Sequence, residues 1–230
     1  MSHPRLVLFD IDGTLLSASG VFREAIAIAL RAAFSCTGPI ESYDFSGKTD
    51  PQIVRELMTA AGLPQRSVAA GLARALDAYR AELLARMEPH DIRAKPGAVS
   101  LVARLALDPR VTLGLLTGNL EACARAKLQP LGLNPHFGFG AYGSDHEDRG
   151  QLPALAVARA FVATGRRFDG KAVVVVGDSV HDVRCGRSLD VRSVAVASGR
   201  TPRATLEAEA PDAVLDDFAD LDAALAAVLG

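Results

Sequence analysis

The sequence predicts an α/β fold: a parallel sheet between two layers of helices, with an all-helical segment inserted after the first strand. Short apolar runs alternate with helical patterns over most of the 230 residues, and this alternation is typical of βαβ units. Residues 17–90 interrupt it with helical patterns alone. The length suits one core with one insertion.

Six apolar runs are expected to form the strands of the sheet. Runs without polar alternation are typical of strands that are buried on both faces, as in a parallel sheet. The predicted strands are residues 6–9, 111–116, 137–142, 172–176, 191–197 and 213–215.

Helical patterns fill the gaps between these strands, at residues 98–107, 120–131, 152–163, 180–189 and 218–229. Asn119 is expected to cap the second of them, and Pro153 stands near the start of the third, where proline is tolerated. Right-handed crossovers then place helices on both faces of the sheet.

The inserted segment is predicted to contain three amphipathic helices and no strand. Their expected ranges are 21–34, 51–61 and 65–86. We therefore expect two units, a core formed by residues 1–16 and 91–230 and a helical cap formed by residues 17–90.

Composition excludes several classes of protein. Twenty-five basic and 27 acidic residues give a net charge of −2, which argues against nucleic acid as a partner. The apolar runs are too short to span a membrane, and the first residues lead straight into an aspartate-bearing strand, so no signal peptide is expected. Three widely spaced cysteines, Cys36, Cys123 and Cys185, indicate a reducing cytoplasm.

Two carboxylates follow the first predicted strand, in Asp10-Ile11-Asp12-Gly13-Thr14. Ligands of open α/β sheets bind at this edge, outside the carboxyl ends of the strands. Strand alternation would send Asp10 and Asp12 to opposite faces unless a sharp turn at Gly13 bends Asp12 back. Because Asp-Gly is also common in turns, a plain capped turn is the alternative interpretation.

A second acidic group, Gly177-Asp178-Ser179 with Asp182, follows the predicted strand 172–176. Four carboxylates at one sheet edge would repel each other unless a cation lies among them. Carboxylate oxygens without convergent cysteine or histidine suit Mg²⁺. A cluster of turn-forming residues is again the alternative.

Two further groups stand at the same edge. Thr117-Gly118-Asn119 ends the predicted strand 111–116, where a hydroxyl and successive amides can cradle a phosphate or simply form a turn. Arg149 follows the third strand and can reach the crevice, or it can be solvated beside Glu147 and Asp148.

Taken together, these groups lie at the ends of successive strands. Because they follow one another in this order along the chain, the sequence resembles the haloacid dehalogenase superfamily. It looks most like the phosphatases of that superfamily with a small helical cap and a Rossmann-like core, and the resemblance covers essentially the whole chain. Asp10 to Thr14 match the first motif, Thr117 to Asn119 the second, Arg149 the third, and Gly177-Asp178-Ser179 with Asp182 the fourth. Residues 143–149 resemble phosphoglycolate-phosphatase-like members.

The resemblance implies a role for each residue. Asp10 would be the nucleophile that forms an aspartyl-phosphate, and Asp12 would protonate the leaving alcohol and later deprotonate water. The Asp10 side chain, the Asp12 backbone carbonyl and Asp178 would hold Mg²⁺. Asp182 would hold a metal-bound water or orient Arg149. The transferring phosphoryl group would be gripped by Thr117 and by the amide of Gly118 or Asn119.

The third motif usually carries a lysine, and here the best-placed cation is Arg149. The chain has 21 arginines and only four lysines. Lys127 and Lys171 are expected to lie at the wrong ends of their elements for the crevice. Lys48, in the cap, is expected to contact a substrate anion, with a surface lysine as the alternative.

The resemblance implies a Mg²⁺-dependent phosphatase for a small phosphorylated metabolite, with phosphoglycolate as the leading candidate. Asp12 favours ester hydrolysis over dehalogenation, since only an alcohol leaving group needs a proton. A sugar phosphomutase of the same fold is one alternative. A non-catalytic phospho-acceptor module is another, against which the inserted helices argue. A monomer or a dimer is expected, with no nucleic-acid or membrane partner.

Overall fold

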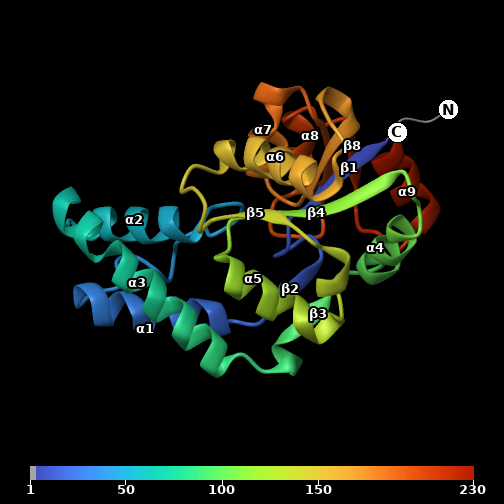
Figure 1. Cartoon of the computed structure of the whole chain (residues 1–230). Helices are drawn as coiled ribbons and strands as arrows, with labels where there is room; N and C mark the ends of the chain where they lie inside the picture. The colour runs from blue at the N-terminus through green and yellow to red at the C-terminus, as the bar shows by residue number, and fades with distance from the viewer. Residues whose placement is uncertain (1–3) are drawn as a thin grey trace.

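The computed structural model describes residues 4–230. Residues 1–3, on which the expectation for the N-terminal segment partly rests, lie outside the described residues. Six strands form one parallel sheet in the order β5-β4-β1-β6-β7-β8 (Figure 1). They are β1 (Arg5–Phe9), β4 (Val111–Thr117), β5 (Gly140–Tyr142), β6 (Val173–Gly177), β7 (Arg192–Val196) and β8 (Ala213–Leu215). The six predicted strands and their parallel arrangement are confirmed.

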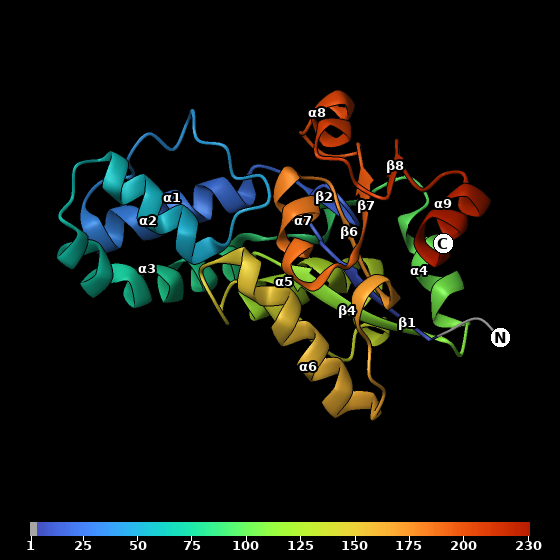
Figure 2. The same cartoon turned by 90° about the horizontal axis from the view of Figure 1, so that it is seen from above.

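Helices cover both faces of this sheet, as predicted (Figure 2). They are α4 (Ala98–Ala106), α5 (Glu121–Leu128), α6 (Leu152–Thr164), α7 (Val180–Cys185), α8 (Arg203–Ala208) and α9 (Leu221–Leu229). The short helix α8 was not predicted. Three predicted helices are shorter in the structure: Pro130 tightens the end of α5 into a 3-10 turn, Gly186 ends α7, and Asp220 caps α9 by accepting from the Ala223 amide at 3.0 Å.

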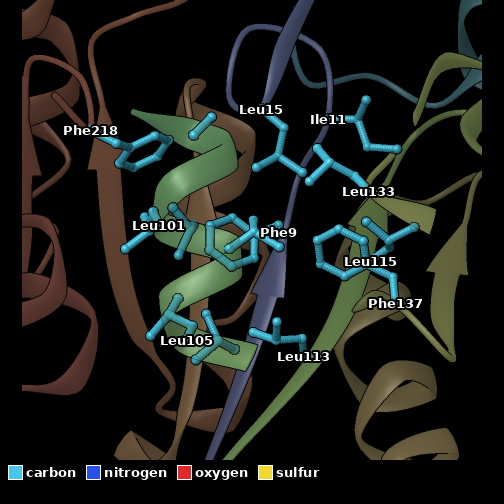
Figure 3. Close-up of a cluster of buried hydrophobic side chains, with 14 of the residues drawn as sticks. Phe9, Ile11, Leu15, Leu101, Leu105, Leu113, Leu115, Leu133, Phe137 and Phe218 are labelled. Atoms are coloured by element: carbon cyan, nitrogen blue, oxygen red, sulfur yellow. The ribbon is translucent and has the colours of Figure 1, made fainter. Parts of the chain in front are cut away.

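Strand β1 shows how the three layers are held together. Leu6 and Leu8 pack in one apolar cluster with α6, whereas Val7 and Phe9 pack in another with α4, α5 and α9. Figure 3 shows Phe9 in the second cluster, close to Leu101 of α4 and near Phe137, whose ring centroid lies 6.2 Å from that of Phe9. Because β1 is buried on both faces, its carboxyl end is held rigidly at the centre of the sheet.

The inserted segment forms the helical cap, which consists of α1 (Val21–Phe34), α2 (Asp50–Ala60) and α3 (Gln65–Arg86). These three helices lie together beside the sheet (Figure 1) and share an apolar cluster of their own. Leu120 and Cys123, at the start of α5, belong to the same cluster, so the cap rests on that helix. Among residues 4–230, no helix has both the length and the apolar character needed to cross a membrane.

The expectation that residues 17–90 contain no strand is wrong at the first two residues. Strand β2 (Leu16–Ala18) pairs antiparallel with β3 (Ile92–Ala94), and this ribbon carries the chain into and out of the cap. The two connections of an insertion run side by side where they leave the core, which allows them to pair. Three residues are too few to show strand alternation in the sequence.

Candidate active site

The carboxyl edge of the sheet opens into a cavity of about 290 Å³ that lies under the cap. Most of the residues predicted for the site line this cavity together: Asp10, Asp12, Lys48, Thr117, Gly118, Asn119, Arg149 and Asp178. Asp182 is buried next to them, in contact with Arg149. The structure thus brings residues from four strand ends and from the cap to one place.

A sharp turn after β1 brings both motif aspartates to the same cavity. Gly13 has a φ of +88°, and the Leu15 amide donates to the Ile11 carbonyl at 2.9 Å. Ile11 therefore points into the core, while Asp12 bends back toward Asp10. A β-carbon at Gly13 would overlap the Asp178 carboxylate, so both the positive φ and the close approach require glycine.

Three buried carboxylates form a cluster that could hold a metal ion. Asp10, Asp178 and Asp182 each offer an oxygen, and these oxygens lie within 4.8 Å of one another. The pKa of Asp10 is raised to about 7, mainly by burial and secondly by the charge of Asp182. Burial and the charges of Asp10 and Asp182 raise the pKa of Asp178 to about 8. Carboxylates that are costly to ionise together are a donor set that fits a hard divalent cation.

Arg149 is buried against this cluster. Its guanidinium donates to Asp10 at 3.0 Å and to the Leu116 carbonyl at 3.2 Å, and it pairs with Asp182. Burial opposes its charge, but Asp182 and Asp10 more than offset this effect and raise the pKa of Arg149. Asp182 is fixed in turn by the Ser179 amide at 3.0 Å and the Ser179 hydroxyl at 2.6 Å.

Asn119 does not cap α5, so that expectation is wrong. Helix α5 has Leu120 at its N-cap position, without a side-chain cap. The Asn119 side-chain amide instead donates to Asp12 at 2.7 Å and to the Thr117 hydroxyl at 2.8 Å. The Leu120 amide donates to the Asp50 carboxylate at 2.8 Å. The Asp50 carboxylate, which comes from the cap, therefore accepts from the backbone amide at the start of α5. The Asn119 side chain can instead hold Asp12 and Thr117 in place.

Lys127 lies in the site, which corrects the expectation that it stands at the wrong end of its helix. Its ammonium lies 2.9 and 2.7 Å from the two Asp12 oxygens and 2.7 Å from Asn119 Oδ1. Helical side chains lean toward the N-terminus, so the long stem reaches back over more than one turn. Burial lowers the pKa of Lys127, but Asp12 and Asp50 raise it above its ordinary value overall.

The other two lysines that were weighed have different surroundings. Lys171 precedes β6 and pairs with Asp212 at 3.0 Å, away from the cavity, as expected. Lys48 lines the cavity, but its ammonium lies 2.7 Å from Glu56 and 3.1 Å from the Tyr43 hydroxyl. The positive charge of Lys48 is therefore already partnered within the cap.

Asp50 is a site residue that the sequence did not reveal, because Thr49-Asp50-Pro51 reads only as a helix start. Asp50 is buried and lines the cavity, and its amide donates to the Gly118 carbonyl at 2.8 Å. The neighbouring Thr49 hydroxyl donates to the Glu147 carbonyl at 2.7 Å. Burial, opposed by the charge of Lys127, raises the pKa of Asp50 to about 7. The cap loop is thus docked onto the core.

Comparison with known proteins gives the same picture over nearly the whole chain. Residues 7–187 match the family of haloacid dehalogenase-like hydrolases. A phosphoglycolate phosphatase of Agrobacterium fabrum is 29% identical over 96% of this chain and 91% of its own length. A phosphoglycolate phosphatase of Rhodospirillum rubrum is 31% identical over 95% of this chain and 89% of its own length.

Solved structures share the fold. A predicted phosphatase from Clostridium acetobutylicum superposes with a TM-score of 0.73 at 16% identity, covering 98% of this chain and 99% of its own. A predicted phosphoglycolate phosphatase from Haemophilus somnus gives 0.69 at 20% identity, covering 97% and 98%. Since the family match spans most of the sequence and the fold agrees, this chain is an enzyme that belongs to the haloacid dehalogenase-like hydrolases.

Proposed function

We propose that this enzyme is a Mg²⁺-dependent phosphatase that hydrolyses a small phosphorylated metabolite through an aspartyl-phosphate. The observation that best supports this proposal is the position of Asp10, which lines the cavity, accepts a hydrogen bond from Arg149 and is clustered with Asp178. A nucleophilic carboxylate must approach a dianionic phosphate, and Arg149, together with a metal ion held by Asp10 and Asp178, would reduce their repulsion. The relatives named as phosphatases support the same reaction class.

Two half-reactions follow from this arrangement. An Asp10 oxygen attacks phosphorus, the bond from phosphorus to the ester oxygen breaks, and Asp12 gives a proton to the departing alcohol. A water molecule then attacks the same phosphorus and loses a proton to Asp12. The bond from phosphorus to Asp10 breaks, which releases phosphate, restores the Asp10 carboxylate and leaves Asp12 protonated for the next turnover.

The metal site would be formed by the side chains of Asp10 and Asp178 and by the backbone carbonyl of Asp12. Bound there, Mg²⁺ would supply positive charge against the phosphoryl oxygens. Asp182 is paired with Arg149 and held by Ser179, which favours an orienting role over a direct metal contact.

The phosphoryl group would be gripped at the end of β4. The Thr117 hydroxyl accepts from the Asn119 side chain at 2.8 Å, so its own proton is free for a phosphoryl oxygen. The backbone amide of Gly118 would add a second donor. Residues 17–90 would act as the cap that excludes bulk water, over a core formed by residues 1–16 and 91–230.

Phosphoglycolate is the first metabolite to test, because it stands in the names of the relatives described above. For Lys48 to bind the carboxylate of phosphoglycolate, its ammonium would have to leave Glu56 and pair with the substrate instead.

All three cysteines are unpaired, which is consistent with action in a reducing compartment such as the cytoplasm.

The test uses p-nitrophenyl phosphate and phosphoglycolate with and without Mg²⁺. Asp10→Asn should abolish phosphate release from both, and wild-type turnover in that variant would exclude Asp10 as nucleophile. Asp12→Asn should accumulate a hydroxylamine-sensitive phosphoenzyme from the aryl phosphate, because water is no longer deprotonated. Conversion of a sugar 1-phosphate to its 6-phosphate with little phosphate release would point to a mutase instead.

A further inference from the structure

The part of the cavity that faces the cap is apolar and aromatic. Phe22 and Ile26 of α1, Ile53 of α2, Tyr79 of α3 and Phe45 of the connecting loop line it. The Phe22 and Phe45 rings meet edge to face with centroids 5.4 Å apart. The Arg23 guanidinium lies 4.5 Å from the centroid of Phe45. These contacts hold the two rings in place. We call the five residues Phe22, Ile26, Phe45, Ile53 and Tyr79 the aromatic wall.

This wall stands where the leaving group must lie. Asp12 donates the proton in the proposed reaction, so the departing oxygen has to be next to it. The Lys127 ammonium, which contacts both Asp12 oxygens, also lies 5.6 Å from the centroid of the Phe22 ring. Phe22 therefore lies near the expected position of the first atoms beyond the ester oxygen.

The cations at this end of the cavity already have partners. Lys48 is paired with Glu56, and Lys127 is paired with Asp12. A second anionic group placed against the rings would thus meet no free ammonium from Lys48 or Lys127, and Arg23, whose guanidinium donates to the Ile40 carbonyl, does not line the cavity. Burial of an anion against the rings is therefore costly.

Two further cations, Lys95 and Arg200, line the cavity from the core. The Lys95 ammonium donates to the Ser198 carbonyl at 2.5 Å. Gly199, between Ser198 and Arg200, packs so closely against Asp178 that a β-carbon there would overlap its carboxylate. Lys95 therefore lies on the side of the candidate metal ligands, whereas the charge of Arg200 helps to lower the pKa of Asp44, the neighbour of Phe45, so Arg200 borders the aromatic wall.

We infer that the substrate's leaving alcohol carries an apolar or aromatic body that packs against Phe22 and Phe45, and that an alcohol without such a body, such as glycolate, makes a poorer substrate. This inference rests on the phosphatase activity proposed above. Removing a phenyl group from water against such a wall should raise kcat/KM roughly 10- to 100-fold.

The experiment compares kcat/KM for ethyl phosphate, 2-phenylethyl phosphate and phosphoglycolate, with p-nitrophenyl phosphate as a general phosphatase substrate. We expect 2-phenylethyl phosphate to exceed both other alkyl substrates by roughly tenfold or more. Phe22→Ala should remove most of this advantage while changing ethyl phosphate little. Phe34→Ala is the matched control, because Phe34 ends the same helix, packs near Gly71 and does not line the cavity.

The wild-type substrate ratios test the inference even if Phe22→Ala fails to fold. Equal values for the three alkyl substrates would overturn it. A preference for phosphoglycolate that Lys95→Met or Arg200→Met removes would also overturn it, since a carboxylate would then be recognised from the core. No phosphate release from any of the four substrates with Mg²⁺ would instead contradict the proposed function.

Discussion

The buried ammonium of Lys127 lies 2.9 and 2.7 Å from the two carboxylate oxygens of Asp12. Asn119 adds a third hydrogen bond, to one of those oxygens, at 2.7 Å. The Lys127 side chain is 3% exposed, so water cannot easily replace this contact. Lys127 and Asn119 together fix the direction of the Asp12 carboxylate, which has to face the leaving group.

Lys127→Met should therefore impair proton donation by Asp12 more than phosphoryl transfer itself. For ethyl phosphate, whose leaving group needs a proton, we expect kcat to fall by roughly 10²-fold or more. For p-nitrophenyl phosphate, whose leaving group departs as an anion, the fall should be much smaller. Steady-state rates with both substrates measure the difference.

Lys171→Met is the matched control, because Lys171 is paired with Asp212 away from the cavity. It should leave both rates close to wild type. Equal losses for the two substrates in Lys127→Met would show that Lys127 supports the fold of the site and does not orient Asp12.

Asp178→Asn should weaken metal binding, since it removes one of the three clustered carboxylates. The Mg²⁺ concentration for half-maximal activity should rise by roughly tenfold or more. Mg²⁺ should also raise the melting temperature of the wild type, because it binds the folded state and relieves repulsion between Asp10 and Asp178. Calorimetry with and without Mg²⁺ checks this, and an undiminished shift in Asp178→Asn would argue against the site.

Asp50→Asn should change how stability depends on pH. The pKa of Asp50 is about 7 in the fold against 3.8 ordinarily, so between these values the folded state holds more protons than the unfolded chain. Stability of the wild type is therefore lost as pH rises through this window, by up to about 4 kcal/mol from this group. The asparagine of the variant keeps an acceptor for the Leu120 amide. Because asparagine does not titrate, the stability of the variant does not fall in this way as pH rises.

Urea unfolding between pH 4 and pH 8, in excess Mg²⁺, measures this effect. The stability of Asp50→Asn relative to wild type should increase toward pH 8. Asp77→Asn, at an exposed position of α3, should show no trend. If the stability of Asp50→Asn relative to wild type instead decreases as pH rises, Asp50 is held in its charged form by Lys127.

The sheet and most of the candidate site could be predicted because both follow from local patterns. Buried strands read as apolar runs, and a parallel sheet brings their carboxyl ends together, so Asp10, Thr117 and Asp178 could be grouped from the sequence alone. Lys127 and Asp50 could not. The position of Lys127 depends on the reach of a long side chain along α5, and that of Asp50 depends on how the cap docks.

Arg149→Met should destabilise the fold, since Arg149 is buried against Asp10 and Asp182. Removing one partner of a buried ion pair costs about 3–5 kcal/mol. The loss should be smaller with Mg²⁺, which can take over part of the neutralisation, and smaller in Arg149→Lys, which keeps the charge. Urea unfolding of both variants checks this, and a fully stable Arg149→Met would mean that the two acids are neutral in the fold.

Gly118→Ala should keep the cap from closing. A β-carbon at Gly118 would overlap the Lys48 carbonyl and lie 2.9 Å from the Thr49 α-carbon. The Gly118 carbonyl also accepts from the Asp50 amide at 2.8 Å. Because the backbone of Gly118 does not have a positive φ, alanine fits the strand end itself, and only the docked loop has to move.

We therefore expect kcat/KM of Gly118→Ala to fall by roughly 10²-fold, since misplacement of closing elements by about an ångström has effects of this size. Trypsin should cleave after Lys48 faster than in the wild type, because the displaced loop exposes it. Gly138→Ala is the control, as its β-carbon would meet no atom within 4 Å. Unchanged proteolysis together with lost activity would mean that Gly118 acts through the phosphoryl group and not through the docking of the cap.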